Sequence, residues 1–72
     1  MSETTMTASE MTTKVYKALA SSEKSIDEVA ANVGITRSEA LSVMLYLAGK
    51  GDIELTDALH SKWAVKHGVM RA

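Results

Sequence analysis

The sequence predicts a mainly α-helical fold of the α+β class, with three helices followed by a small two-stranded β-hairpin. Apolar residues recur at a helical period up to Gly51 and at a period of two after it. Ser25 and Thr36 are each followed three residues later by a glutamate, which is the spacing of a capping box at the start of a helix. The segment between these two helix starts is long enough for one short helix and a turn. The predicted organisation is a disordered N-terminus at 1–6, one domain at 7–67 and a C-terminal tail at 68–72.

The first helix is expected to begin near Ala8, because Thr7 and Glu10 have the spacing of another capping box. The polar segment 21–24 is expected to end this helix. Its apolar stripe consists of Met11, Val15, Ala18 and Leu19.

The middle of the chain is typical of a helix-turn-helix. The capping box at Ser25 starts a helix predicted over 26–33, and Gly34 follows it where a left-handed residue can end a helix. The capping box at Thr36 starts the next helix. That helix is expected to stop within the glycine-containing segment 49–51.

Two half-buried strands are predicted after this helix. Segments 53–56 and 62–66 alternate apolar and polar residues, and segment 57–61 is expected to form the loop between them. Trp63 is expected to anchor the hairpin on the core.

The predicted elements carry the short motifs Lys14-Val15-Tyr16, Val29-Ala30, Gly34-Ile35-Thr36, Leu47-Ala48, Lys50-Gly51-Asp52-Ile53-Glu54 and Trp63. This order of elements, together with these motifs, resembles the winged helix-turn-helix superfamily over about residues 12–67. The resemblance also implies a third short strand around Ser25, before the second helix. In that superfamily a small residue precedes the turn glycine by four positions, and a Leu-x-x-x-Gly-x-Ile sequence leads from the recognition helix into the hairpin, or wing. More narrowly, the chain looks similar to small free-standing prokaryotic winged-helix domains of unassigned function.

In the winged-helix docking mode, the start and outer face of the recognition helix contact base edges and phosphates. In this chain the recognition helix is the one predicted after Thr36. Applied to this chain, that mode predicts a small transcriptional regulator with double-stranded DNA as its partner. Arg37 can fork onto a guanine or a phosphate, and the lysines of the hairpin can neutralise phosphates. The predicted DNA contacts are Thr36, Arg37, Ser38, Ser42, Tyr46, Lys62, Lys66 and Arg71.

The same helix carries a second signal, because Leu41 and Leu45 occupy positions where a DNA reader usually has polar or basic residues. Exposing a leucine forgoes about 1.5–3 kcal/mol of burial. Either the first helix covers these leucines or another chain does, and we expect a homodimer that uses them as contacts. The alternative function is therefore a protein–protein interaction or dimerisation module that does not bind specific DNA.

Composition and charge exclude several other classes of function. A net charge of −1 and a pI near 6.0 argue against a general nucleic-acid coat protein. The absence of cysteine excludes thiolate metal sites and suits a reducing, cytoplasmic compartment. The spacing of His60 and His67 does not suit a metal pair, so we expect no metal, no cofactor and no enzymatic activity. No apolar run is long enough for a membrane span, so no membrane partner is expected.

Overall fold

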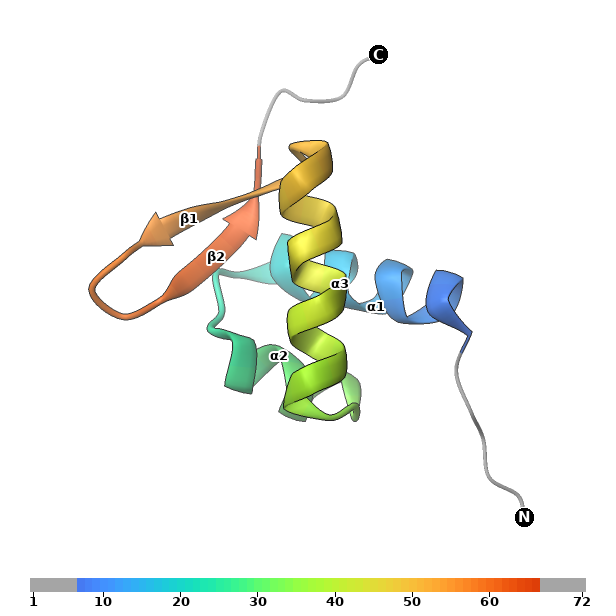
Figure 1. Cartoon of the computed structure of the whole chain (residues 1–72). Coiled ribbons are helices and arrows are strands. Elements are labelled where there is room, and N and C mark those ends of the chain that lie inside the picture. Colours follow the sequence, from blue (N-terminus) through green and yellow to red (C-terminus); the bar gives the residue numbers. More distant parts are fainter. Residues whose placement is uncertain (1–6, 67–72) are drawn as a thin grey trace.

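The structure, a computed structural model, describes residues 7–66 and has the predicted order of three helices and a hairpin (Figure 1). The predicted α+β class is confirmed, with the layout of a winged helix. The predictions for segments 1–6 and 68–72, for His67 and for Arg71 lie outside the described residues. The elements are α1 (Ala8–Ser21), α2 (Ile26–Val33), α3 (Arg37–Lys50), β1 (Ile53–Asp57) and β2 (Lys62–Val65).

All three helices begin with the predicted capping boxes. At each start a Ser or Thr hydroxyl oxygen accepts from the amide of a glutamate three residues later, and the glutamate carboxylate accepts from the amide of the cap residue. Two of the reciprocal bonds measure 2.9 Å, from the amides of Ser25 and Thr36 to Glu28 and Glu39. The sequence therefore places the helix starts correctly.

Left-handed glycines end α2 and α3. Gly34 has a φ of 86° and Gly51 a φ of 85°, a region that favours glycine because it has no Cβ. The amides of Gly34 and Ile35 both donate to the carbonyl of Ala30, at 2.9 and 3.0 Å, which closes the turn between α2 and α3. α3 continues through Gly49 as regular helix and ends at Lys50, with Gly51 as its cap.

The core lies where the inner faces of the three helices meet β1. Trp63, the expected anchor of the hairpin, packs against this core but is only partly buried. No helix within residues 7–66 is long and apolar enough to cross a membrane. The buried side chains of the core are Val15, Leu19, Val29, Ala30, Ala40, Val43, Met44, Leu47 and Ile53.

The hairpin is antiparallel, with Leu55 opposite Trp63, and its register shifts between Leu55 and Asp57. The expected third strand reduces to a single bridge at Lys24, whose backbone amide and carbonyl pair with Trp63 at 2.9 and 2.8 Å. The Lys24 ammonium also donates to the carbonyl of Ala18 at 2.8 Å, so its side chain caps the C-terminal end of α1. One residue thus joins the hairpin to the first helix.

Candidate nucleic-acid interface

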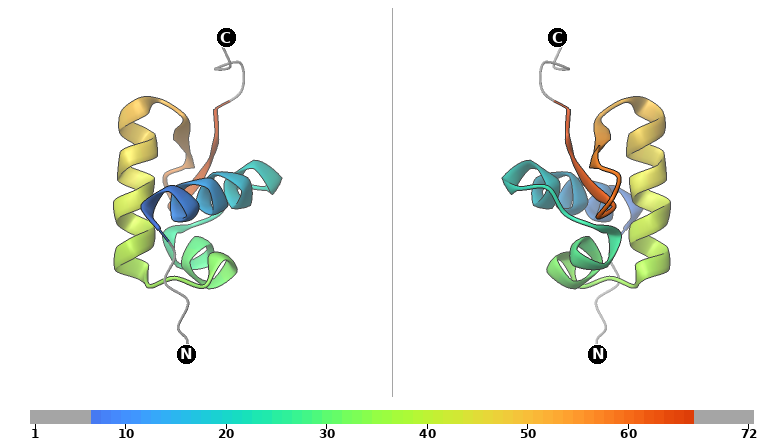
Figure 2. Two further views of the ribbon diagram at one scale, coloured as in Figure 1. Left: turned by 90° about the vertical axis from the view of Figure 1, so that its right-hand side faces the viewer. Right: turned by 90° about the vertical axis from the view of Figure 1, so that its left-hand side faces the viewer.

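α3 follows the turn and stands at one edge of the molecule, as both side views show (Figure 2). Its inner face supplies four residues to the core, and its opposite side is open. The exposed residues on this open side include Ser38, Ser42 and Leu45, with Leu41 half-buried beside them. This side carries hydroxyl groups and apolar side chains.

The first predicted contact, Thr36, is committed to the start of α3. Its hydroxyl oxygen accepts from the Glu39 amide at 3.0 Å, and its own amide donates to the Glu39 carboxylate. The acidic Glu39 near the expected phosphate surface is explained by the same capping box. The structural role of both residues is therefore to define where α3 begins.

Arg37, the second predicted contact, forms an ion pair with α2. Its Nε donates to Oδ1 of Asp27 at 2.8 Å, and both side chains are exposed. Exposed ion pairs of this kind contribute about 0–1 kcal/mol to stability. Arg37 is therefore held at the turn between α2 and α3 by a weak interaction that a competing anion can replace.

Lys62, at the start of β2, is paired with Glu28, the residue next to Asp27 in α2. Its Nζ donates to Oε1 of Glu28, the same oxygen that accepts from the Ser25 amide. The hydrogen bond from Lys62 holds the pKa of the Glu28 carboxyl below its ordinary value, and the bond from the Ser25 amide lowers that pKa further. The first turn of α2 thus presents two adjacent carboxylates, and each one engages a predicted phosphate contact.

The remaining hairpin residues give the interface a mixed character. Lys66 is exposed and forms no ion pair within residues 7–66. Leu59 in the hairpin loop is 85% exposed. Asp57 accepts from the ring of His60 at 2.9 Å, and this bond lowers the pKa of the Asp57 carboxyl. The loop therefore presents an acidic and apolar surface, which the sequence analysis did not identify.

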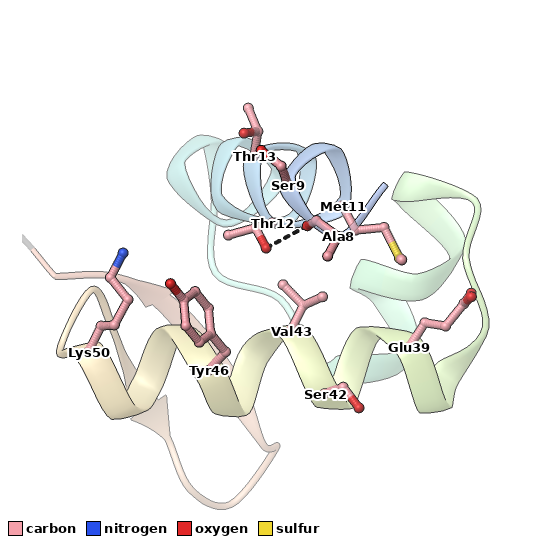
Figure 3. Close-up of a pocket in the computed structure, with 10 residues that line it drawn as sticks. All are labelled: Ala8, Ser9, Met11, Thr12, Thr13, Glu39, Ser42, Val43, Tyr46 and Lys50. Carbon is pink, nitrogen blue, oxygen red and sulfur yellow. Dashed lines mark hydrogen bonds between the residues drawn. The ribbon is translucent and has the colours of Figure 1, made fainter. Parts of the chain in front are cut away.

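A groove of about 570 Å³ separates the N-terminal half of α1 from α3 (Figure 3). Val43, Tyr46 and Lys50 lie on the side of α3 that faces α1, and Ser42 also lines the groove. The Lys50 ammonium lies 5.2 Å from the centre of the Tyr46 ring. Tyr46 therefore lines a groove with α1, and the sequence analysis missed both this groove and Lys50.

Leu45 is 61% exposed, so the first helix does not cover it. Leu41 is half-buried. We expected either the first helix or another chain to cover these leucines, and the structure excludes the first helix for Leu45.

Within residues 7–66, no cluster of three or more His, Asp or Glu side chains could hold a metal ion. Comparison with known protein families, with curated proteins and with solved structures found no match.

Proposed function

We propose that this chain is a small DNA-binding protein, a transcriptional regulator that reads duplex DNA with α3. The observation that carries the proposal is the helix-turn-helix formed by α2 and α3, with the open side of α3 at the edge of the molecule beside the hairpin. An α-helix of this kind fits the major groove of B-DNA, and a β-hairpin can follow the adjacent backbone. The proposed setting is the cytoplasm, which suits a chain without cysteine.

In the proposed complex Arg37 and Ser38 lie at the start of α3, where they can reach base edges or phosphates. Lys62 and Lys66 of the hairpin bind phosphates. Arg37 and Lys62 exchange their carboxylate partners for phosphate oxygens. This exchange costs little for Arg37, because its ion pair with Asp27 is exposed, and more for Lys62, whose side chain is only 26% exposed. Three cations that contact phosphates predict a slope of about −2.7 for the logarithm of the association constant against the logarithm of salt concentration. The affinity is therefore modest and salt-sensitive.

Fluorescence anisotropy with labelled duplexes, both random and genomic, tests this proposal at a series of salt concentrations. Lys62→Ala should weaken binding to all sequences and reduce the salt slope by about 1. Arg37→Ala should weaken binding and change the sequence preference if Arg37 reads a base. Lys14→Ala is the control, because Lys14 is an exposed lysine on α1 outside the proposed contacts. Absence of binding to every duplex at low salt would overturn the proposal.

The exposed Leu45 favours a second candidate function, a protein-interaction module. The open side of α3 carries Leu41 and Leu45 rather than cations, and an apolar helix face is typical of a surface that another protein covers. If this candidate is right, Leu45→Glu should change the mass of the assembly measured by light scattering. Neither the wild-type chain nor this variant should then show salt-dependent binding to DNA. If Leu45→Glu leaves the mass unchanged, this candidate is excluded.

A further inference from the structure

The groove between α1 and α3 is lined by a straight row of side chains on α3. Glu39, Val43, Tyr46 and Lys50 follow one another at spacings of four, three and four, so they share one face for three turns. Met11 of α1 lies opposite this row. The middle of the floor, formed by Met11, Val43 and the Tyr46 ring, is therefore apolar.

The two ends of this row carry opposite charges. Glu39 lies in the first turn of α3 and Lys50 in its last turn, about 16 Å apart at the rise of a regular helix. Both side chains are exposed in part, and Lys50 also pairs with Asp52 at 3.2 Å. The α1 side of the groove is neutral, because it consists of Ala8, Ser9, Met11, Thr12 and Thr13.

We propose that this groove receives α3 of a second copy of the chain, antiparallel to the first. Glu39 of each copy then faces Lys50 of the other, and Tyr46 of each copy lies over Val43 of the other. Both pairings have their midpoint between residues 44 and 45, so one two-fold axis satisfies them together. Tyr46, which is 57% exposed in the single chain, is covered in the pair.

Charge decides between this arrangement and its alternatives. A parallel pair would place Glu39 against Glu39 and Lys50 against Lys50, which is repulsive at both ends. The antiparallel pair is attractive at both ends and also opposes the two helix dipoles. A nucleic acid fits the groove poorly, because one cation and one carboxylate line it together with neutral side chains.

The pairing goes beyond the proposed function and does not rest on it. Leu45 does not line this groove, so the contact also differs from the one expected from Leu41 and Leu45. Packed helices lie about 8–10 Å apart, whereas two half-sites on duplex DNA are about 34 Å apart. DNA reading by α3 therefore belongs to the single chain, and self-association competes with it.

Sedimentation equilibrium of the full chain, without DNA, tests the proposal. The wild-type chain should show a concentration-dependent dimer. Lys50→Glu should raise the dissociation constant about tenfold or more, because two attractive contacts become repulsive. Glu39→Lys should have a similar effect. An equimolar mixture of the two variants should restore association, since each Glu then faces a Lys across the heterodimer.

Lys66→Glu is the matched control, since Lys66 is an exposed lysine on the hairpin side and should leave the dissociation constant unchanged. Circular dichroism checks that the variants fold, because Glu39→Lys removes half of a capping box. Lys50→Glu leaves that box intact and decides the question alone if Glu39→Lys unfolds. A wild-type chain that stays monomeric at every concentration, or a Lys50→Glu variant that dimerises as well as the wild type, overturns the proposal.

Discussion

Lys62 on the hairpin donates a hydrogen bond to Glu28 in the first turn of α2, although 34 residues separate them in the sequence. The neighbouring Asp27 accepts from Arg37 at 2.8 Å. Under the proposed function, the carboxylates of Glu28 and Asp27 pair with the same cations, Lys62 and Arg37, that would bind the phosphates of duplex DNA. The two acids therefore act as internal competitors of the phosphate backbone.

The first prediction concerns this competition. Asp27→Asn and Glu28→Gln should each raise the affinity for duplex DNA about two- to fivefold, because each removes a weak ion pair and one negative charge. Glutamine still completes a capping box, so α2 keeps its start. Anisotropy titrations at constant salt measure the effect. Glu54→Gln, a change at an exposed acid of β1, is the control and should have a smaller effect; equal effects at all three sites would show that net charge alone matters.

Acid should weaken the fold through Glu28. Its pKa in the folded chain lies below the value in the unfolded chain, so the stabilisation is present above the unfolded pKa of about 4.3 and is lost as the pH falls through the folded pKa. Urea unfolding between about pH 6 and pH 3 should show a falling free energy of unfolding. In Glu28→Gln this decline should be shallower. A parallel decline in the two proteins would contradict the assignment.

The two glycines near the end of α3 should respond in opposite directions to alanine. An added Cβ meets no atom within 4 Å at Gly49 or Gly51, so only the backbone conformation distinguishes them. Gly51 has a φ of 85°, and Gly51→Ala should cost about 1–2 kcal/mol. Gly49 is regular helix, and Gly49→Ala should gain about 0.5–1 kcal/mol. Chemical denaturation measures both changes, and a common sign would contradict the prediction.

Ser61 in the hairpin loop has a φ of 55°, which is costly for a residue with a side chain. Ser61→Gly should therefore stabilise the chain by up to about 1 kcal/mol. Ala58→Gly, in the same loop but without a positive φ, should destabilise it by about 0.4–1 kcal/mol through the greater freedom of the unfolded chain. Thermal unfolding of the pair measures the contrast, and a lower melting temperature for Ser61→Gly would refute it.

Local chemistry explains which parts of the fold were predictable. The capping boxes and Gly34 act over three or four residues, so the boundaries of α2 follow from the sequence. The left-handed Ser61 could not be anticipated, because serine does not mark that conformation. The ion pair of Arg37 with Asp27 also escaped prediction, since it depends on how α2 and α3 cross.

The candidate site was harder to predict than the fold. The α3 sequence is apolar nearly all round, so its pattern did not indicate which side faces α1 and which faces solvent. Tyr46 consequently lines a groove that the sequence did not predict, while Leu45 remains exposed. The position of Lys62 in the hairpin led to its prediction as a phosphate contact. Its pairing with Glu28 could not be predicted, because it depends on how the hairpin packs against α2.

Lys24 joins two parts of the chain, the hairpin and α1, since its backbone holds Trp63 while its ammonium holds the last turn of α1. The hairpin cannot pivot away from the helices without breaking the two backbone bonds to Lys24. A ligand that docks on β2 consequently meets a surface whose shape was set during folding. The entropy of ordering that surface is lost before the encounter, so little of the binding energy is spent on rigidifying it.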